Sequence, residues 1–184
     1  IFILSFPLNK TFLKNSLTWL FIGFSIHLGF FASVFQIIST DPLSSLALNF
    51  SNDRLFLLYV VLISVLMDSI AFFVGKNFGK RPFINNVSPN KTMEGFLSAV
   101  TIAPIFLLLT SSQAFELPII LVFIVLTLVS IFSVIGDAVA SLMKRVVEVK
   151  DYSNLIPGHG GLFDRLDSHI AAFPCFIFLL NILS

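Results

Sequence analysis

Long apolar stretches recur along this chain, and each is about as long as a lipid bilayer is thick. Four of them occupy residues 16–38, 55–75, 95–112 and 117–140, and a fifth begins polar near 162 and continues to 184. Because a helix of about 20 apolar residues crosses the hydrocarbon core of a membrane, the pattern predicts an all-α polytopic integral membrane protein. With residues 1–8 counted as the end of a further helix, we expect five to six transmembrane helices.

Composition agrees with a membrane protein and excludes several classes of site. Only 11% of the residues are charged, whereas a soluble domain carries roughly 25%. The net charge of +1 provides no bulk basic surface, so we expect no nucleic-acid partner. Cys175 is the single cysteine, which excludes an intramolecular disulfide and a cysteine-rich metal site. Its apolar surroundings favour a packing role.

Basic residues alternate between the predicted loops. The first, third and fifth loops, at 9–15, 76–94 and 141–168, hold all the Lys and Arg except Arg54: Lys10, Lys14, Lys76, Lys80, Arg81, Lys91, Lys144, Arg145, Lys150 and Arg165. Loops enriched in Lys and Arg face the cytoplasm in most membrane proteins. The polar site is therefore expected near the cytoplasmic face.

Two carboxylates are predicted inside the membrane. Asp68 precedes Lys76 by eight residues and Asp137 precedes Lys144 by seven, which places each about 10–12 Å inside its helix end. An ionised Asp in hydrocarbon is costly, so two at one depth indicate a shared polar pocket. Asp137, Ser141 and Lys144 follow the spacing i, i+4 and i+7, which puts them on one helical face. The alternative is a buried Asp that is paired only for helix packing.

The polar run 157–161, PGHGG, cannot continue a helix. Its glycines would let the backbone approach a ligand and direct N–H groups toward it, although a flexible turn is the alternative. Asp164 and Asp167 follow at i and i+3, at the expected start of the last helix. Compensation of the helix dipole would explain either carboxylate alone.

Residues 88–95, SPNKTMEG, open the third apolar segment. Ser88 is predicted as the helix N-cap, with Pro89 in the first turn. A helix N-terminus with Lys91 and Thr92 beside it would bind an anion. The alternative is an ordinary capped helix start.

Together these groups suit phosphoryl or nucleotidyl transfer. Carboxylates hold Mg²⁺ and leave coordination positions for phosphate oxygens, while Lys and Arg neutralise the remaining phosphate charge. A proton or ion transporter would need acidic residues across the bilayer, and the outer helix halves hold none. His27, midway along its segment, is expected to be a satisfied core histidine.

Residues 141–167, SLMKRVVEVKDYSNLIPGHGGLFDRLD, resemble the signature of the phosphatidate cytidylyltransferases, also called CDP-diacylglycerol synthases. Every fixed position of the pattern S-x-x-K-R-x4-K-D-x-S-x2-[apolar]-P-G-H-G-G-x2-D-R-x-D is filled, from Ser141 to Asp167. The preceding Gly136-Asp137 also fits, as does the upstream pattern D-S-x-A-x3-G-K…SP-x-KT-x-EG from Asp68 to Gly95. The resemblance covers residues 60–184.

The resemblance implies the reaction of CTP and phosphatidate to CDP-diacylglycerol and pyrophosphate. It implies catalytic roles for Asp137, Asp164, Asp68, Asp167 and Lys144, of which Asp137 and Asp164 would bind the metal. It implies substrate binding by Ser88, Lys91, Thr92, Ser141, Arg145, Lys150, His159, Gly160, Gly161 and Arg165. Mg²⁺ is the expected cofactor, and the resemblance allows a second, monovalent ion such as K⁺.

We expect a single transmembrane domain over 1–184, with the signature region at 136–168 and an N-terminal truncation relative to the family. The expected location is a bacterial inner (plasma) membrane, and the expected partners are CTP, phosphatidate and membrane lipids. The sequence leaves a homodimer open. The alternatives are a cytidylyltransferase or kinase acting on another lipid, an ion transporter using Asp68 and Asp137, and an inactive membrane scaffold.

Overall fold

A computed structural model describes residues 16–39, 53–84, 87–111, 118–149, 151–153, 161 and 163–183. They form the helices α3 (Ser16–Ser39), α5 (Asp53–Phe78), α6 (Met93–Ser111), α7 (Ile119–Val146) and α8 (Phe163–Leu183). All five are long and apolar enough to cross a membrane, which confirms the expected class of integral membrane protein. The stretch 1–8, expected to end a further helix, lies outside the described residues.

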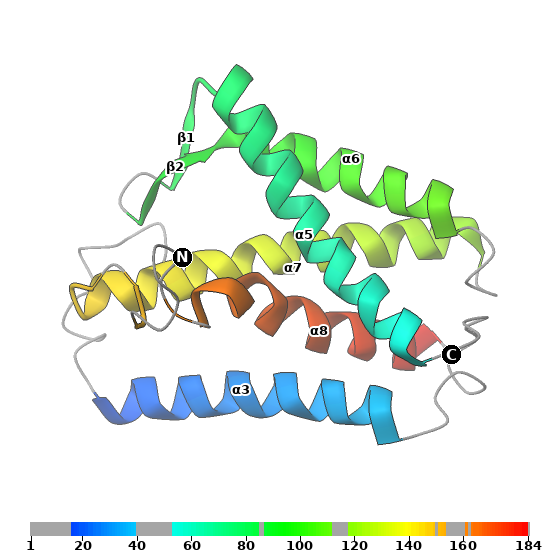
Figure 1. Ribbon diagram of the computed structural model, residues 1–184, viewed down its shortest axis with the longest axis horizontal. Coiled ribbons are helices and arrows are strands. Elements are labelled where there is room, and N and C mark those ends of the chain that lie inside the picture. The colour runs from blue at the N-terminus through cyan, green and yellow to red at the C-terminus, as the bar shows by residue number, and fades with distance from the viewer. Residues whose placement is uncertain are drawn as a thin grey trace.

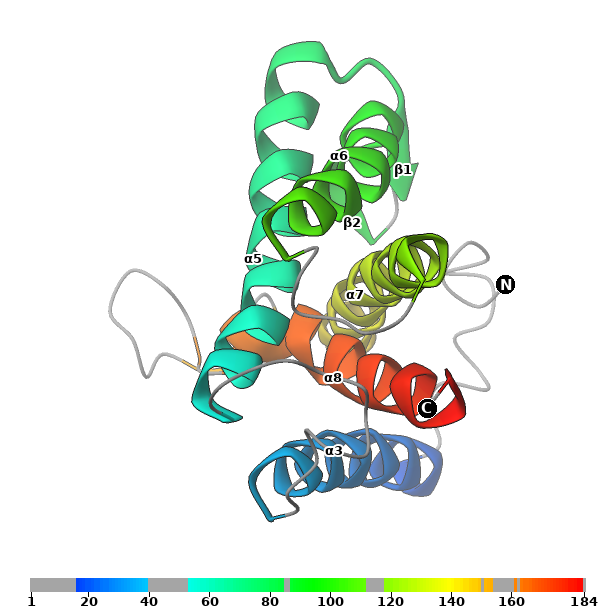
Figure 2. The ribbon, with the colours of Figure 1, turned by 90° about the vertical axis from the view of Figure 1, so that its right-hand side faces the viewer.

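The helices form one bundle around α7 and α8, which lie side by side (Figure 1). Helix α5 crosses this pair obliquely (Figure 1), and α6 packs against both α5 and α7. Helix α3 lies at the opposite edge and packs mainly on α8 (Figure 2). The end of α7 and the starts of α3 and α8 share one end of the bundle (Figure 1).

Apolar side chains fill the bundle and also cover its outside. The largest buried cluster joins α5, α7 and α8 through Val60, Ile63, Leu126, Val129 and Phe176. On α3, by contrast, Phe21, Phe24, Phe31 and Phe35 are exposed. A helix that is apolar all round is typical of a lipid environment, so these outer side chains are expected to face the membrane.

Small residues let α5 and α6 approach closely. A Cβ added to Gly95 would lie 2.5 Å from the carbonyl oxygen of Ala71 and 3.1 Å from Cα of Gly75. Membrane helices commonly use such small-residue contacts, because lipid tails give apolar side chains no reason to prefer a protein neighbour. This contact fixes the start of α6, and with it the position of the strand that precedes it.

A short hairpin precedes α6 and was not expected from the sequence. Strands β1 (Pro82–Ile84) and β2 (Ser88–Thr92) pair antiparallel, with an irregularity in their register. The prediction that Ser88 caps the helix was therefore wrong, because helix α6 begins at Met93. Thr92 is the capping residue, since its Oγ1 accepts a hydrogen bond of 3.2 Å from the Gly95 N–H. Pro89 favours an extended conformation for Ser88, the residue before it.

Candidate active site

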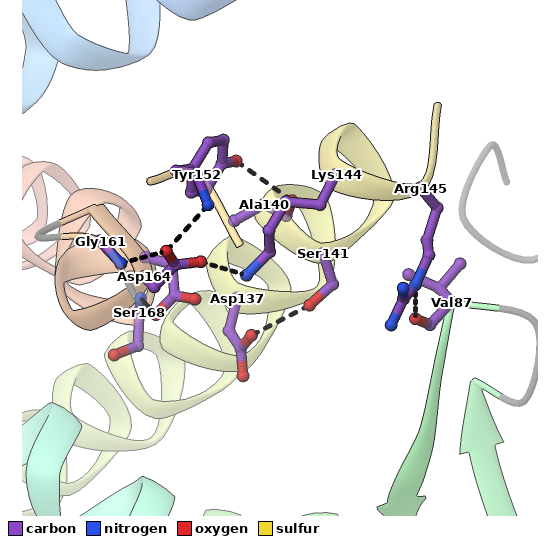
Figure 3. Close-up of polar contacts among 11 residues, drawn as sticks. Val87, Asp137, Ala140, Ser141, Lys144, Arg145, Tyr152, Gly161, Asp164 and Ser168 are labelled. Atoms are coloured by element: carbon purple, nitrogen blue, oxygen red, sulfur yellow. Dashed lines mark hydrogen bonds and ion pairs between the residues drawn. The ribbon is translucent and has the colours of Figure 1, made fainter. Parts of the chain in front are cut away.

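The last turns of α7 present three polar side chains on one face. Ser141 Oγ donates to Asp137 Oδ1 at 3.4 Å, and Lys144 Nζ donates to Asp164 Oδ1 of α8 at 2.8 Å (Figure 3). The predicted alignment of Asp137, Ser141 and Lys144 is therefore confirmed. Helix α7 continues to Val146, six residues beyond the predicted span, and this extension brings Lys144 to α8.

Asp164 is held by three donors at the start of α8. Besides Lys144, the backbone N–H groups of Gly161 and Tyr152 donate to its Oδ2 at 2.8 and 2.9 Å. The Asp164 N–H in turn donates to the Gly161 carbonyl at 3.2 Å, a reciprocal pairing like that of a capping box. Burial raises the pKa of Asp164, but hydrogen bonds from Lys144 and the two N–H groups outweigh it and lower that pKa below its usual value. The carboxylate is therefore ionised at neutral pH.

Lys91 of β2 forms a second ion pair, with Asp137 Oδ2 of α7. The two side chains are partly buried, with exposed fractions of 27% and 20%. The hairpin thus carries a cation from the α5–α6 side of the bundle to the end of α7. The anion-binding role predicted for the segment around Lys91 would therefore depend on strand β2 and not on a helix N-terminus.

Further carboxylates surround Asp137. Ser168 Oγ of α8 donates to Asp68 Oδ2 of α5 at 3.0 Å, which ties these two helices together. Asp68, Asp137 and Asp167 lie close enough for their negative charges to repel one another. Lys91 and Lys144 offset that repulsion, since Lys91 interacts with Asp68 and Lys144 with Asp167. We call the four Asp and two Lys, residues 68, 91, 137, 144, 164 and 167, the carboxylate–lysine cluster.

Other predicted site residues lie elsewhere or support the structure. Arg145 Nε donates to the Val87 carbonyl at 3.2 Å, and its side chain points away from Asp164 (Figure 3). Arg145 therefore anchors the hairpin, as Thr92 caps α6. Ser88 pairs with Ile84 in the hairpin. Gly161 uses its N–H on Asp164 and not on a ligand. Lys150, His159, Gly160 and the Arg165 side chain lie outside the described residues.

Two residues of the site were missed by sequence reasoning. Tyr152 donates its hydroxyl to the Ala140 carbonyl at 3.1 Å, and its ring centroid lies 5.2 Å from Lys144 Nζ. An aromatic residue in a polar loop was the available signal. Ser168 carried no signal beyond its place after Asp167, because its partner Asp68 lies 100 residues away in the sequence.

The donor chemistry of Asp137 and Asp164 fits Mg²⁺. Each carboxylate binds an ammonium group in this structure. Mg²⁺ prefers oxygen ligands and usually binds through one or two carboxylates together with substrate phosphates. Across the part of the chain that the structure describes, no three His, Cys, Asp or Glu side chains converge to hold a metal. Two carboxylates suit a Mg²⁺ ion that also takes oxygen ligands from a phosphate.

Comparison with known proteins identifies the family of the chain. The family model described as "Cytidylyltransferase family" matches residues 2–183. A phosphatidate cytidylyltransferase of Bacillus subtilis is 38% identical over 130 residues, which cover 70% of this chain and 48% of that protein. Its counterpart in Haemophilus influenzae is 38% identical over 184 residues, covering 95% and 61%. That of Aquifex aeolicus is 39% identical over 113 residues, covering 61% and 42%.

The chain thus spans about half the length of the curated relatives it matches. The family match extends over nearly the whole chain and includes every residue of the carboxylate–lysine cluster. The chain belongs to the cytidylyltransferase family.

Proposed function

We propose that this chain carries the site at which CTP and phosphatidate give CDP-diacylglycerol and pyrophosphate. One observation carries the proposal. Two lysine–carboxylate pairs, Lys91–Asp137 and Lys144–Asp164, are brought together from β2, α7 and α8. Membership of the cytidylyltransferase family, and relatives named phosphatidate cytidylyltransferase, support it.

The proposed reaction joins two anions, which repel each other. The lysines of the carboxylate–lysine cluster would offset that repulsion. A phosphate oxygen of phosphatidate forms a bond to the α-phosphorus of CTP, while the bond from that phosphorus to pyrophosphate breaks. Lys91 and Lys144 would neutralise phosphate charge as it moves to the leaving group. Their ion pairs with Asp137 and Asp164 hold the ammonium groups in place before the substrates arrive, which limits reorganisation during the reaction.

Asp137 and Asp164 would hold Mg²⁺, and the bound ion supplies charge neutralisation and alignment of the triphosphate. Asp68 and Asp167 would add negative charge around it. Ser141, which donates to Asp137, would orient that carboxylate. Tyr152 would fix Asp164 through its backbone N–H.

We also propose that this site faces the cytoplasm. Lys80, Arg81 and Lys91 lie in the basic segment 76–94, and Lys144 lies in the basic segment 141–168. Segments rich in Lys and Arg between membrane spans remain on the cytoplasmic side. A water-soluble nucleotide would then enter from the cytoplasm, while the lipid phosphate comes from the membrane interface.

The test uses the purified chain in mixed micelles of detergent and phosphatidate, with Mg²⁺ and CTP labelled in the cytidine. We expect a lipid-extractable cytidine product and one pyrophosphate per product. Asp137→Asn should abolish both while the protein remains folded by circular dichroism, and EDTA should do the same to the wild type.

Three results would contradict the proposal. Phosphate transfer to a lipid without a cytidine product would indicate a lipid kinase. Ion flux across vesicles without CTP turnover would indicate a transporter. A folded wild-type chain that binds no CTP would indicate a membrane scaffold.

A further inference from the structure

Tyr152 lies in the segment between α7 and α8 and contacts the site at three points. Its backbone N–H donates to Asp164 Oδ2 at 2.9 Å. Its hydroxyl donates to the Ala140 carbonyl of α7 at 3.1 Å (Figure 3). Its ring centroid lies 5.2 Å from Lys144 Nζ. One residue thus contacts both members of the Lys144–Asp164 ion pair and the helix that carries Lys144.

These contacts fix the Tyr152 ring beside the Lys144 ammonium. The N–H and the hydroxyl lie at opposite ends of the residue and bind to different helices, so the ring between them has little freedom. The Phe163 ring packs against it edge-on, with centroids 6.3 Å apart, an arrangement that aromatic pairs favour. Only 12% of the Lys144 side chain is exposed, and the Tyr152 ring is part of what covers it.

Phe163 extends this aromatic contact to α3, where its ring centroid lies 5.2 Å from that of His27. Nδ1 of His27 is hydrogen-bonded to the Gly23 carbonyl at 2.7 Å, so the helix satisfies one ring nitrogen, as expected. The His27 ring is only half-buried, however, and therefore differs from the packed core histidine that the sequence predicted. Helix α3 thus supports the position of Tyr152 through His27 and Phe163.

Lys144 would have to change partners during the proposed reaction. Its ammonium is bound to Asp164 in this structure, whereas neutralising a leaving pyrophosphate requires that ammonium on a phosphate oxygen. The lysine side chain is flexible, so an ammonium released from Asp164 would otherwise move through many positions. The face of the Tyr152 ring attracts a cation and carries no net charge that would repel a phosphate.

We propose that Tyr152 positions Lys144, its ring holding the ammonium in place while Lys144 exchanges Asp164 for a phosphate oxygen. The inference rests on the proposed function and adds a positioning residue that acts through Lys144. A second carboxylate beside Lys144 would also hold the ammonium, but its negative charge would oppose the approach of the phosphate. An uncharged ring holds the ammonium without that cost.

The first test compares Tyr152→Phe, which keeps the ring, with Tyr152→Leu, which removes it. Both keep the backbone N–H that donates to Asp164. Tyr152→Leu should lower turnover at saturating CTP about 5- to 30-fold, the range expected for loss of a cation–π contact, and Tyr152→Phe should lose less. The CTP concentration for half-maximal rate should change little, because Lys144 would oppose charge that grows as pyrophosphate leaves. Equal losses in the two variants would overturn the proposal.

A second cation–π contact provides a matched control. Lys76 Nζ lies 5.7 Å from the centroid of the Phe72 ring on α5, and neither residue belongs to the carboxylate–lysine cluster. Phe72→Leu removes this contact at a position that is 70% exposed, so turnover should stay at the wild-type value. A loss as large as that of Tyr152→Leu would contradict a role specific to Tyr152.

Ring fluorination separates positioning from packing. Tyr152→Phe made with one, two or three fluorine atoms on the ring keeps nearly the same shape, while each fluorine makes the ring face less negative and weakens its attraction for a cation. We expect turnover to fall with each added fluorine while the thermal midpoint in detergent stays nearly constant. Turnover that is the same across the series would overturn the proposal, because packing alone does not depend on the charge distribution of the ring.

Acetylation of lysine amines provides a readout that does not require the reaction. Asp164→Asn removes the charged partner of Lys144, so the Tyr152 ring alone should then protect the amine. Brief treatment with a water-soluble acetylating reagent, followed by mass spectrometry, compares Lys144 with the exposed Lys76 in the same sample. Adding Tyr152→Leu to Asp164→Asn should raise that ratio several-fold, whereas adding Tyr152→Phe should leave it nearly unchanged. An equal ratio in all three proteins would overturn the proposal.

The two hypotheses fail separately. If the wild type forms no cytidine product, the proposed function fails, and the acetylation of Lys144 decides whether the ring holds its ammonium. If the wild type forms product and neither Tyr152→Leu nor ring fluorination lowers turnover, the positioning role fails and the reaction stands.

Discussion

Lys144 Nζ lies 2.8 Å from Asp164 Oδ1, and this contact joins the last turn of α7 to the first turn of α8. Each charge also suits its own helix, because cations are favoured at a helix C-terminus and anions at an N-terminus. Only 12% of the Lys144 side chain and 8% of the Asp164 side chain are exposed. Removal of either partner therefore leaves a largely buried charge without its counterion.

The first prediction separates what the Lys144–Asp164 pair contributes to stability from what it contributes to the reaction. Breaking a fully buried ion pair costs roughly 3–5 kcal/mol, whereas replacing both partners by apolar residues is often neutral. Lys144→Met and Asp164→Asn should each lower the thermal midpoint in detergent. Lys144→Met with Asp164→Leu should recover only part of the loss, because leucine cannot accept from the Gly161 and Tyr152 N–H groups. All three variants should lack cytidylyl transfer. Activity in the stable double variant would show that the pair only supports the fold.

The second prediction concerns Lys91, which reaches Asp137 from the hairpin. Hydrogen bonds to charged groups contribute about 1.5–3 kcal/mol, so Lys91→Met should lower turnover roughly 10- to 100-fold. Lys80→Met is the matched control, because Lys80 is exposed on the same basic loop. Steady-state kinetics at saturating and limiting CTP would measure both variants. Equal losses would indicate a general effect of loop charge and not a role for Lys91.

The membrane class and the aligned face of α7 were predictable because they depend on local regularities. Apolar stretches of bilayer length and the spacing of Asp137, Ser141 and Lys144 can be read without knowledge of distant residues. The partners of these side chains are a different matter. Asp137 meets Lys91 across 46 residues of sequence, and Asp68 meets Ser168 across 100.

The hairpin explains most of what the sequence did not reveal. Residues 88–92 contain good capping residues, so a helix start was the natural local interpretation. Tertiary pairing with β1 prevailed and moved the start of α6 to Met93. The hairpin also determines where the Arg145 side chain points, because Arg145 donates to the Val87 carbonyl beside the hairpin.

The third prediction is a titration of Tyr152, which lies outside the membrane-spanning segments. Burial, with the negative charges of Asp167 and Asp164, raises the pKa of Tyr152 to about 12, from about 10 in an unfolded chain. The neutral phenol therefore favours the folded state below pH 10, and this contribution is lost as the pH rises through 12. Tyr59→Phe leaves Tyr152 as the only tyrosine. Its near-ultraviolet absorbance should show no phenolate at pH 10.5, and half ionisation there would contradict the structure.

The fourth prediction tests whether the close packing of α7 against α8 positions the Asp137 side chain. A Cβ added to Gly136 would lie 2.6 Å from Ala171 Cβ and 3.0 Å from the Asp167 carbonyl oxygen. Overpacking typically costs about 1–3 kcal/mol, so Gly136→Ala should lower the thermal midpoint. It should also reduce cytidylyl transfer, because Asp137 is the next residue.

Gly23→Ala is the control for Gly136→Ala, since its added Cβ would meet nothing within 4 Å, and it should behave like the wild type. Ala171→Gly removes the nearer of the two obstructing atoms. Combined with Gly136→Ala, it should restore part of both stability and activity, the Asp167 carbonyl accounting for the remainder. If the double variant regained stability without activity, the backbone at Gly136 would matter to the reaction in a way that helix packing does not explain.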